Sequence, residues 1–129
     1  ELQEGSTWEA LMSGATFGCD NLVALFDCNG VQADGAVHVA LEPVADKIAA
    51  FGWDTAEIDG NDIEALVAAL AAARVRDGRP KAIVMRTTPG FGIPTLRRRE
   101  RAHFVRIPDD EWQVMRQELE SGRPEVSHV

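Results

Sequence analysis

"NLVALFDCNG", residues 21–30, decides the fold class, because an apolar run in it stops abruptly at an acid, a thiol, an amide and a glycine. The apolar part, residues 21–27, is too short for a core helix and is bounded by polar residues, which is typical of a strand buried on both faces of a parallel sheet. In open α/β sheets, ligands bind outside the carboxyl ends of the strands. Asp27, Asn29 and Gly30 therefore mark a candidate site; the alternative is a plain turn, because Asp and Asn before Gly commonly end a strand.

Helical and strand patterns alternate on both sides of this run. They predict helices over residues 5–18, 43–52 and 61–75, and further strands over residues 53–59 and 81–87. This alternation predicts an α/β fold with a doubly wound, mainly parallel sheet and helices on both faces.

The ends of the predicted helices carry capping signals. Ser6 with Glu9, and Asn61 with Glu64, stand at the spacing of a capping box. Gly52 suits the C-terminal cap of the second helix. One face of the third helix is apolar and is made by Ile63, Leu66, Val67 and Leu70.

Beyond residue 87 the pattern changes to a loop rich in glycine, proline and basic residues, followed by an amphipathic helix over residues 108–120. We expect residues 123–129 to be a flexible tail. A helix that opens almost at the first residue leaves the first βα unit without its strand. We therefore expect residues 1–122 to be the C-terminal portion of a domain, in a chain that is truncated or is the ordered part of a longer one.

The composition limits the class of protein. A chain of 129 residues, 45% hydrophobic and 26% charged, fits one globular domain. Its net charge of -8 makes nucleic acid and anionic membranes poor partners. No apolar run approaches the roughly 20 residues of a membrane span, and no leader opens the chain, so we expect a soluble, cytoplasmic protein. Cys19 and Cys28 lack metal-binding spacing and are expected to be buried thiols.

Four blocks of the sequence, "ELQEGSTWEA", "DNLVALFDCNGVQADG", "AFGWDTAEIDGND" and "VMRTTPGFG", resemble in this order the diphosphate-binding domain of transketolases. The resemblance is best to the split kind, whose two halves are separate polypeptides. It covers residues 1–92 well and continues more loosely to residue 120. It implies the thiamine diphosphate-binding fold, thiamine diphosphate and Mg²⁺ as cofactors, and transfer of a two-carbon ketol unit from a ketose or ketose phosphate to an aldehyde.

Other activities of the same fold stay open at this point. They are a 2-oxoacid dehydrogenase first component, a deoxyxylulose phosphate synthase, and a non-catalytic subunit that keeps the fold without the site. The "ELQEG" and "FGWDTAEIDGND" blocks favour transketolase over the other two enzymes.

The resemblance also implies ligands for the cofactor. The family motif begins with Gly-Asp-Gly and closes with an asparagine, which matches Asn29; the carbonyl two residues on matches Val31. These two would bind Mg²⁺, and Gly30 and Ile93 would contact the cofactor. The Gly-Asp-Gly would sit immediately before Glu1, so its aspartate ligand is absent. We expect the two neutral oxygens alone to hold Mg²⁺ weakly.

Two residues are catalytic candidates by resemblance. Glu4 matches a glutamate of a carboxylate network near the subunit interface; the alternative is an acid in the first turn of a helix, where the dipole favours it. His103 lies where relatives have a histidine that reaches the diphosphate and the substrate, with Phe104 in place of the usual glycine. The alternative for His103 is a plain surface histidine.

Arg97, Arg98 and Arg99 stand out in an acidic chain. They make a solvated loop face, a clamp for a substrate phosphate, or a docking site for an acidic partner such as a carrier protein that presents the acceptor. The resemblance further implies a companion subunit with the pyrimidine-binding domain, in a heterotetramer.

Overall fold

The computed structural model describes residues 1–32, 35–37, 40–99 and 105–122. The chain divides into two compact units. The first consists of Glu1–Asn29 and His38–Thr87, and the second of Gly30–Val37 and Thr88–Val129.

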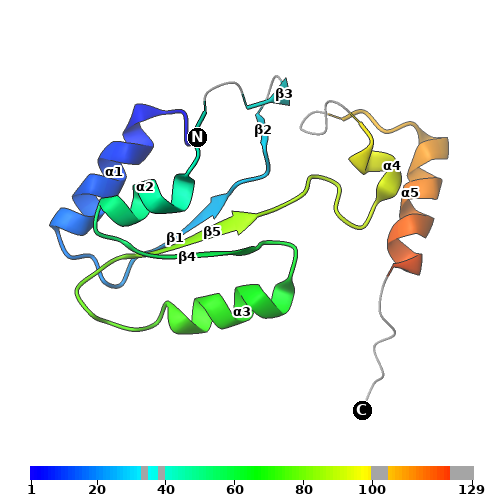
Figure 1. Cartoon of the computed structure of the whole chain (residues 1–129). Helices are drawn as coiled ribbons and strands as arrows, with labels where there is room; N and C mark the ends of the chain where they lie inside the picture. The colour runs from blue at the N-terminus through cyan, green and yellow to red at the C-terminus, as the bar shows by residue number, and fades with distance from the viewer. Residues whose placement is uncertain (33–34, 38–39, 100–104, 123–129) are drawn as a thin grey trace, which may run out of the picture. The chain divides into compact units, whose positions relative to one another are not determined.

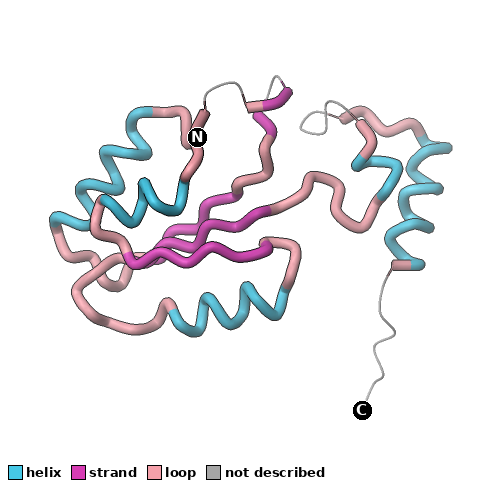
Figure 2. Tube along the Cα trace, viewed as in Figure 1, coloured by secondary structure: helices cyan, strands magenta, loops and turns pink. Residues whose placement is uncertain are grey.

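The first unit is built on a parallel sheet of three strands. β5 (Lys81–Arg86) lies in the centre, with β1 (Val23–Asp27) and β4 (Asp54–Asp59) on its two sides (Figure 2). Both outer strands start level with Lys81 in the register of the sheet. Their carboxyl ends therefore meet at one edge, as the sequence predicted.

Helices cover both faces of this sheet. α1 (Gly5–Thr16) and α2 (Val44–Ala50) lie on one face, and α3 (Ile63–Ala72) lies on the other (Figure 1). The predicted doubly wound α/β fold is confirmed. In the part of the chain that the structure describes, no helix has the length and apolar character needed to cross a membrane.

The core lies between the sheet and the α1 and α2 layer. Its buried residues are Leu11, Phe26, Val44, Ile48, Trp53, Ala82 and Val84. The Trp53 Nε1 atom donates a hydrogen bond of 2.8 Å to the Leu11 carbonyl. A Cβ atom on Gly14 would lie 2.9 Å from the Trp53 ring, so the missing side chain lets α1 approach the indole closely.

The prediction that β1 is buried on both faces is wrong. Phe26 points into the core, whereas Val23 and Leu25 are 38% and 50% exposed. Because side chains alternate along a strand, Val23 and Leu25 lie on the opposite face. There α3 packs against β4, and β1 is an outer strand.

The apolar face of α3 is likewise largely exposed. Ile63 and Val67 are 69% and 61% exposed, and none of the residues of α3 is buried. Its half-buried residues include Leu66 and Ala69. Apolar spacing therefore predicted the helix correctly, but only part of its apolar face is covered within the described residues.

The predicted capping box of α1 is wrong. The helix begins at Gly5, with Glu4 as its N-cap residue, and the Glu4 side chain makes no capping hydrogen bond. Ser6 therefore lies inside the first turn rather than before it. The spacing of Ser6 and Glu9 has no capping role because the helix starts two residues earlier than a Ser6 cap requires.

The cap of α3 is shifted by one residue from the prediction. Asp62, rather than Asn61, precedes the helix, and its Oδ1 atom accepts from the Glu64 and Ala65 amides at 2.9 and 3.1 Å. The carboxylate satisfies two amides that have no partner inside the helix. At the end of α2, Gly52 adopts a φ of +93°, which suits the predicted terminating glycine.

In its described residues, the second unit contains four elements. They are β2 (Val31–Gln32), β3 (Gly35–Ala36), α4 (Pro94–Arg97) and α5 (Asp109–Ser121). β2 and β3 pair antiparallel. α5 confirms the predicted last helix within one residue, whereas the four residues of α4 fall in a predicted loop. The Glu118 carboxylate holds α4 against α5 by accepting from the Thr95 amide and hydroxyl, at 3.0 and 2.8 Å.

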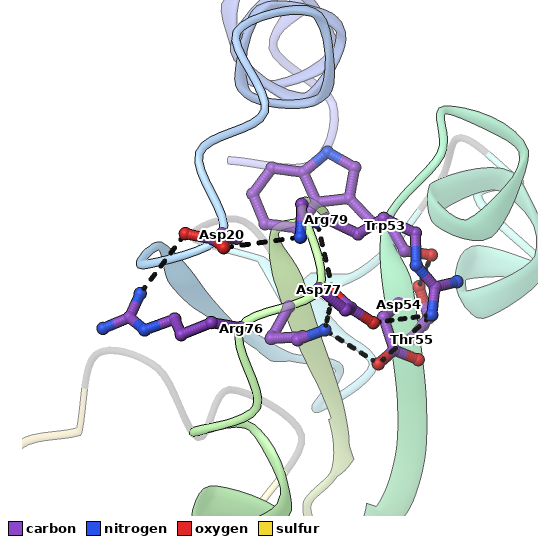
Figure 3. A network of polar contacts seen from close by, with 9 residues as sticks. Asp20, Trp53, Asp54, Thr55, Arg76, Asp77 and Arg79 are labelled. Atoms are coloured by element: carbon purple, nitrogen blue, oxygen red, sulfur yellow. Dashed lines mark hydrogen bonds and ion pairs between the residues drawn. The ribbon is translucent and has the colours of Figure 1, made fainter.

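A charged cluster occupies the amino end of the sheet in the first unit. Lys81 is only 2% exposed, and its Nζ atom donates to Asp77 at 2.5 Å and to Asp54 at 3.1 Å. Arg79 also donates to Asp77, at 2.9 Å (Figure 3). These hydrogen bonds, first from Lys81 and then from Arg79, hold the pKa of Asp77 well below its usual range. The buried amine is thus stabilised by two carboxylates.

We predict that Asp77→Asn lowers the free energy of unfolding at pH 7. The difference from the wild type should become smaller in acid. Because the folded-state pKa of Asp77 lies below the ordinary 3.8, the carboxylate stabilises the fold fully above that pH. The contribution is lost as the pH falls through the folded-state value. Urea unfolding at pH 7 and pH 3 measures the difference. If this difference in the free energy of unfolding were the same at both pH values, the stabilising role of the Asp77 carboxylate would be contradicted. Glu9→Gln, on the exposed surface of α1, is the control.

Candidate functional site

Polar side chains gather at the carboxyl edge of the sheet in the first unit. Asp27 ends β1, Arg86 ends β5 and is followed by Thr87, and Glu57 projects from β4. All three strands run parallel, so Asp27, Arg86 and Thr87 come from neighbouring strand ends, and Glu57 lies two residues before the end of β4. This is the edge at which ligands bind in open α/β sheets.

Asp27 is bonded on both of its carboxylate oxygens. Its Oδ1 atom accepts from the Thr87 hydroxyl, and its Oδ2 atom accepts from the Asn29 Nδ2 atom at 3.0 Å. A carboxylate only accepts hydrogen bonds, so the amide nitrogen of Asn29 must face it. The oxygen of that amide is consequently on the other side, turned away from Asp27.

Gly60 brings the end of β4 against Thr87. Its amide donates to the Arg86 carbonyl at 2.9 Å. A Cβ atom at this position would lie 2.5 Å from the Thr87 Cγ2 atom and 2.7 Å from the Met85 Cβ atom. Only glycine allows so close an approach, and the Thr87 methyl group therefore packs on β4 while its hydroxyl reaches Asp27.

Arg86 joins two carboxylates at the same edge. Its Nε atom donates to Glu57 at 2.9 Å, and its Nη2 atom donates to Glu42 at 3.0 Å. The hydrogen bonds from Arg86 lower the pKa of Glu42, and the two carboxylates raise the pKa of Arg86. Glu42 also accepts from the Val44 amide at 3.1 Å, so the cluster fixes the start of α2 beside the strand ends.

Cys28, next to these groups, is a half-buried thiol with a raised pKa. Burial raises its pKa above 9.0, against the opposing effect of Arg86. The group is therefore an uncharged thiol at neutral pH, whereas reactive cysteines are thiolates. Cys19 and Cys28 are both free, as expected, but both are half-buried, whereas the sequence predicted buried thiols.

Of the site residues named from the sequence, the first unit contains Asn29 and Glu4. Asn29 is half-buried and lies at the carboxyl edge. The residue before it, Cys28, still hydrogen-bonds to the sheet, because its amide donates to the Met85 carbonyl at 2.9 Å. Glu4 is exposed at the start of α1 and has no capping role.

The other named residues belong to the second unit or lie outside the described residues. Gly30 has a φ of +73°, Val31 pairs with Ala36, and Ile93 is the N-cap residue of α4. His103 and the predicted tail, residues 123–129, lie outside the described residues.

The three arginines are not equivalent. Arg99 donates to the Glu111 carboxylate and, at 3.2 Å, to the Arg106 carbonyl. Arg97 and Arg98 are exposed, and within the described part of the chain neither makes an ion pair. The structure thus separates Arg99, which connects the α4 region to α5, from two arginines that face solvent.

Sequence reasoning missed Thr87, Arg86 and Gly60 as parts of this edge. A polar pair directly after the buried run of β5 was the available signal for Arg86 and Thr87. Gly60 had no such signal, because a glycine after a strand is also typical of an ordinary turn.

The fold and this edge define the chain as an α/β domain with a polar carboxyl edge. Residues 1–126 match the family described as "Transketolase, thiamine diphosphate binding domain". The chain belongs to this family.

Individual relatives agree with this assignment. An uncharacterised transketolase family protein from Sinorhizobium fredii is 48% identical over 115 residues, which are 87% of this chain and 41% of that protein. A 6-deoxy-6-sulfo-D-fructose transketolase subunit from Clostridium sp. is 34% identical over 122 residues, 93% of this chain and 44% of that protein. The chain thus spans less than half the length of either relative.

A solved structure gives the same fold. Transketolase from Campylobacter jejuni superposes with a TM-score of 0.79 over 92% of this chain and 19% of that one, at 24% identity. This likeness shows the fold.

We predict that Gly60→Ala destabilises the protein by about 1–3 kcal/mol, the usual cost of overpacking. The added methyl group would displace Thr87 and Met85. Gly5→Ala is the matched control, because a Cβ atom there meets nothing within 4 Å and alanine favours a helix by up to about 1 kcal/mol. Urea unfolding of both variants tests this, and a Gly60→Ala protein as stable as the wild type would refute the close approach.

Proposed function

We propose that this chain is the diphosphate-binding part of a transketolase made of two kinds of subunit. It transfers a two-carbon ketol unit from a ketose or ketose phosphate to an aldehyde acceptor. The observation that carries the proposal is the orientation of Asn29: in a chain of the thiamine diphosphate-binding family, its amide oxygen is turned away from Asp27 at the carboxyl edge of the sheet.

The residues fit Mg²⁺ in their chemistry. The side-chain oxygen of Asn29 and the backbone carbonyl of Val31 are the oxygen donors that this cation prefers. Within the described residues, no group of three or more His, Cys, Asp or Glu side chains is arranged to hold a metal. Both proposed donors are neutral, because one is an amide oxygen and the other a backbone carbonyl. The negative charge would come from the diphosphate and from an aspartate of a Gly-Asp-Gly that residues 1–129 do not contain.

Thiamine diphosphate, when bound, supplies the carbanion-stabilising chemistry of the reaction. The residues of this chain would hold and orient it: Gly30 and Ile93 would contact the cofactor, and His103 would contact the diphosphate and the substrate. Glu4, exposed at the start of α1, joins a carboxylate network with the companion subunit. That subunit supplies the pyrimidine-binding domain, in a heterotetramer. The Clostridium relative is itself named a transketolase subunit, which supports a divided enzyme.

Arg97 and Arg98 bind the phosphate of the donor in this proposal. Both are exposed, and a guanidinium presents a planar fork of donors to phosphate oxygens. Arg99 has a structural role instead, since Glu111 and the Arg106 carbonyl already bind it.

We predict that Asn29→Ala weakens the binding of Mg²⁺ and thiamine diphosphate by at least about tenfold, because loss of even an outer-shell partner typically has that effect. Isothermal titration of the full encoded polypeptide, with and without its companion subunit, measures the affinity. Tight binding is expected only with the companion present.

Asn21→Ala is the control for this experiment, because Asn21 is an exposed asparagine before the amino end of β1. Its affinity should equal that of the wild type. Binding that Asn29→Ala leaves unchanged would disprove the proposed ligand.

We predict that Arg97→Ala and Arg98→Ala each raise the KM for phosphorylated donors on the order of tenfold, the effect of losing one charge-assisted hydrogen bond. The KM for an unphosphorylated ketose should stay the same. Arg99→Ala should instead lower the melting temperature, because it loses its bonds to Glu111 and Arg106. Steady-state kinetics and thermal unfolding separate the two roles, and equal effects on both donors would exclude a phosphate clamp.

A further inference from the structure

We propose that Asp27 and Thr87 are positioning residues for Asn29. The Thr87 hydroxyl fixes the carboxylate of Asp27, the carboxylate holds the amide nitrogen of Asn29, and the amide oxygen is thereby aimed at the cation. This inference rests on the proposed function, because it concerns the same metal ligand.

The first step is the choice between the two ends of the Asn29 amide. An amide group that rotates by half a turn exchanges an oxygen acceptor for a nitrogen donor at nearly the same place. A cation is bound by the first and repelled by the second. The 3.0 Å bond from Nδ2 to Asp27 makes the choice, since the carboxylate accepts only from the nitrogen.

The second step concerns the Asp27 carboxylate, which is exposed and would rotate if only one of its oxygens were bonded. Thr87 binds the oxygen that Asn29 does not use. The two hydrogen bonds together set the rotation of the carboxylate about its own axis. Outer-shell groups of this kind orient metal ligands in many proteins.

The third step concerns what holds Thr87 and the backbone. A Cβ atom on Gly60 would lie 2.5 Å from the Thr87 Cγ2 atom, so the glycine leaves the space that the Thr87 methyl group occupies. The Cys28 amide donates to the Met85 carbonyl at 2.9 Å, so the backbone is tied to β5 up to the residue before Asn29. The 3.0 Å hydrogen bond from the Asn29 Nδ2 atom to Asp27 then constrains the rotation of the Asn29 side chain.

The test uses the full polypeptide with its companion subunit and measures the affinity for Mg²⁺ at saturating thiamine diphosphate by isothermal titration. Thr87→Val keeps the shape of the side chain and removes the hydroxyl, so the affinity should fall about tenfold to a hundredfold. Thr87→Ser keeps the hydroxyl and should retain the affinity of the wild type. Thr55→Val, which removes a hydroxyl near the amino end of β4, is the matched control and should change nothing.

Asp27→Leu gives a second, independent variant. It fills a similar volume and removes the acceptor of the Asn29 Nδ2 atom, so the affinity should again fall. In both variants the kcat at saturating Mg²⁺ should return to the wild-type value, because the ligand itself is present and only its orientation is lost.

The outcomes distinguish this inference from the proposed function. If Asn29→Ala weakens Mg²⁺ binding while Thr87→Val and Asp27→Leu do not, the positioning role is overturned and the metal ligand stands. If Thr87→Ser binds Mg²⁺ as weakly as Thr87→Val, the methyl contact with Gly60 matters instead of the hydroxyl. This result would also overturn the positioning role. If Mg²⁺ binding does not depend on Asn29, both proposals are disproved: Asn29 as the metal ligand, and Asp27 and Thr87 as its positioning residues.

Discussion

The register of β1 and β4 on the central strand β5 is the constraint on which the rest of the first unit depends. Both outer strands begin opposite Lys81, so their carboxyl ends reach Met85 and Arg86 together. A slip of one residue would turn every side chain of the slipped strand to the other face. It would separate Asp27 from Thr87 and remove the close approach of Gly60, so the polar edge exists only in this register.

The two ends of the sheet use charge in different ways. At the amino end, the buried Lys81 is surrounded by Asp54 and Asp77, and the charges satisfy one another. At the carboxyl end, Arg86 donates hydrogen bonds to the carboxylates of Glu42 and Glu57. Asp27 instead accepts from two neutral groups, the Asn29 amide and the Thr87 hydroxyl. A buried amine needs partners because its desolvation is costly. The carboxyl end, by contrast, keeps the Asp27 carboxylate for orienting a neighbouring amide.

The sequence predicted the features that depend on local pattern. Alternating helices and strands, the doubly wound sheet and the strand end at Asp27 follow from hydrophobic periodicity and from polar residues at strand ends. It did not predict the exposure of Val23 and Leu25, because burial of a strand depends on its place in the sheet rather than on its own residues. Asp62 replaced Asn61 as the cap for a similar reason: two neighbouring capping residues are equally good by type, and only the path of the chain selects one.

The positioning contacts could not be predicted from the sequence because their partners are far apart along the chain. Thr87 and Asp27 are separated by 60 residues, and no local pattern marks a threonine as the partner of a distant aspartate. The resemblance to transketolases pointed to Asn29, which a motif can identify, but a motif does not name the side chains that hold its amide oxygen in place. That information lies in the acceptor-only chemistry of Asp27 and in the space that Gly60 leaves for Thr87. A ligand in a short loop is thus oriented by strands that the motif does not include.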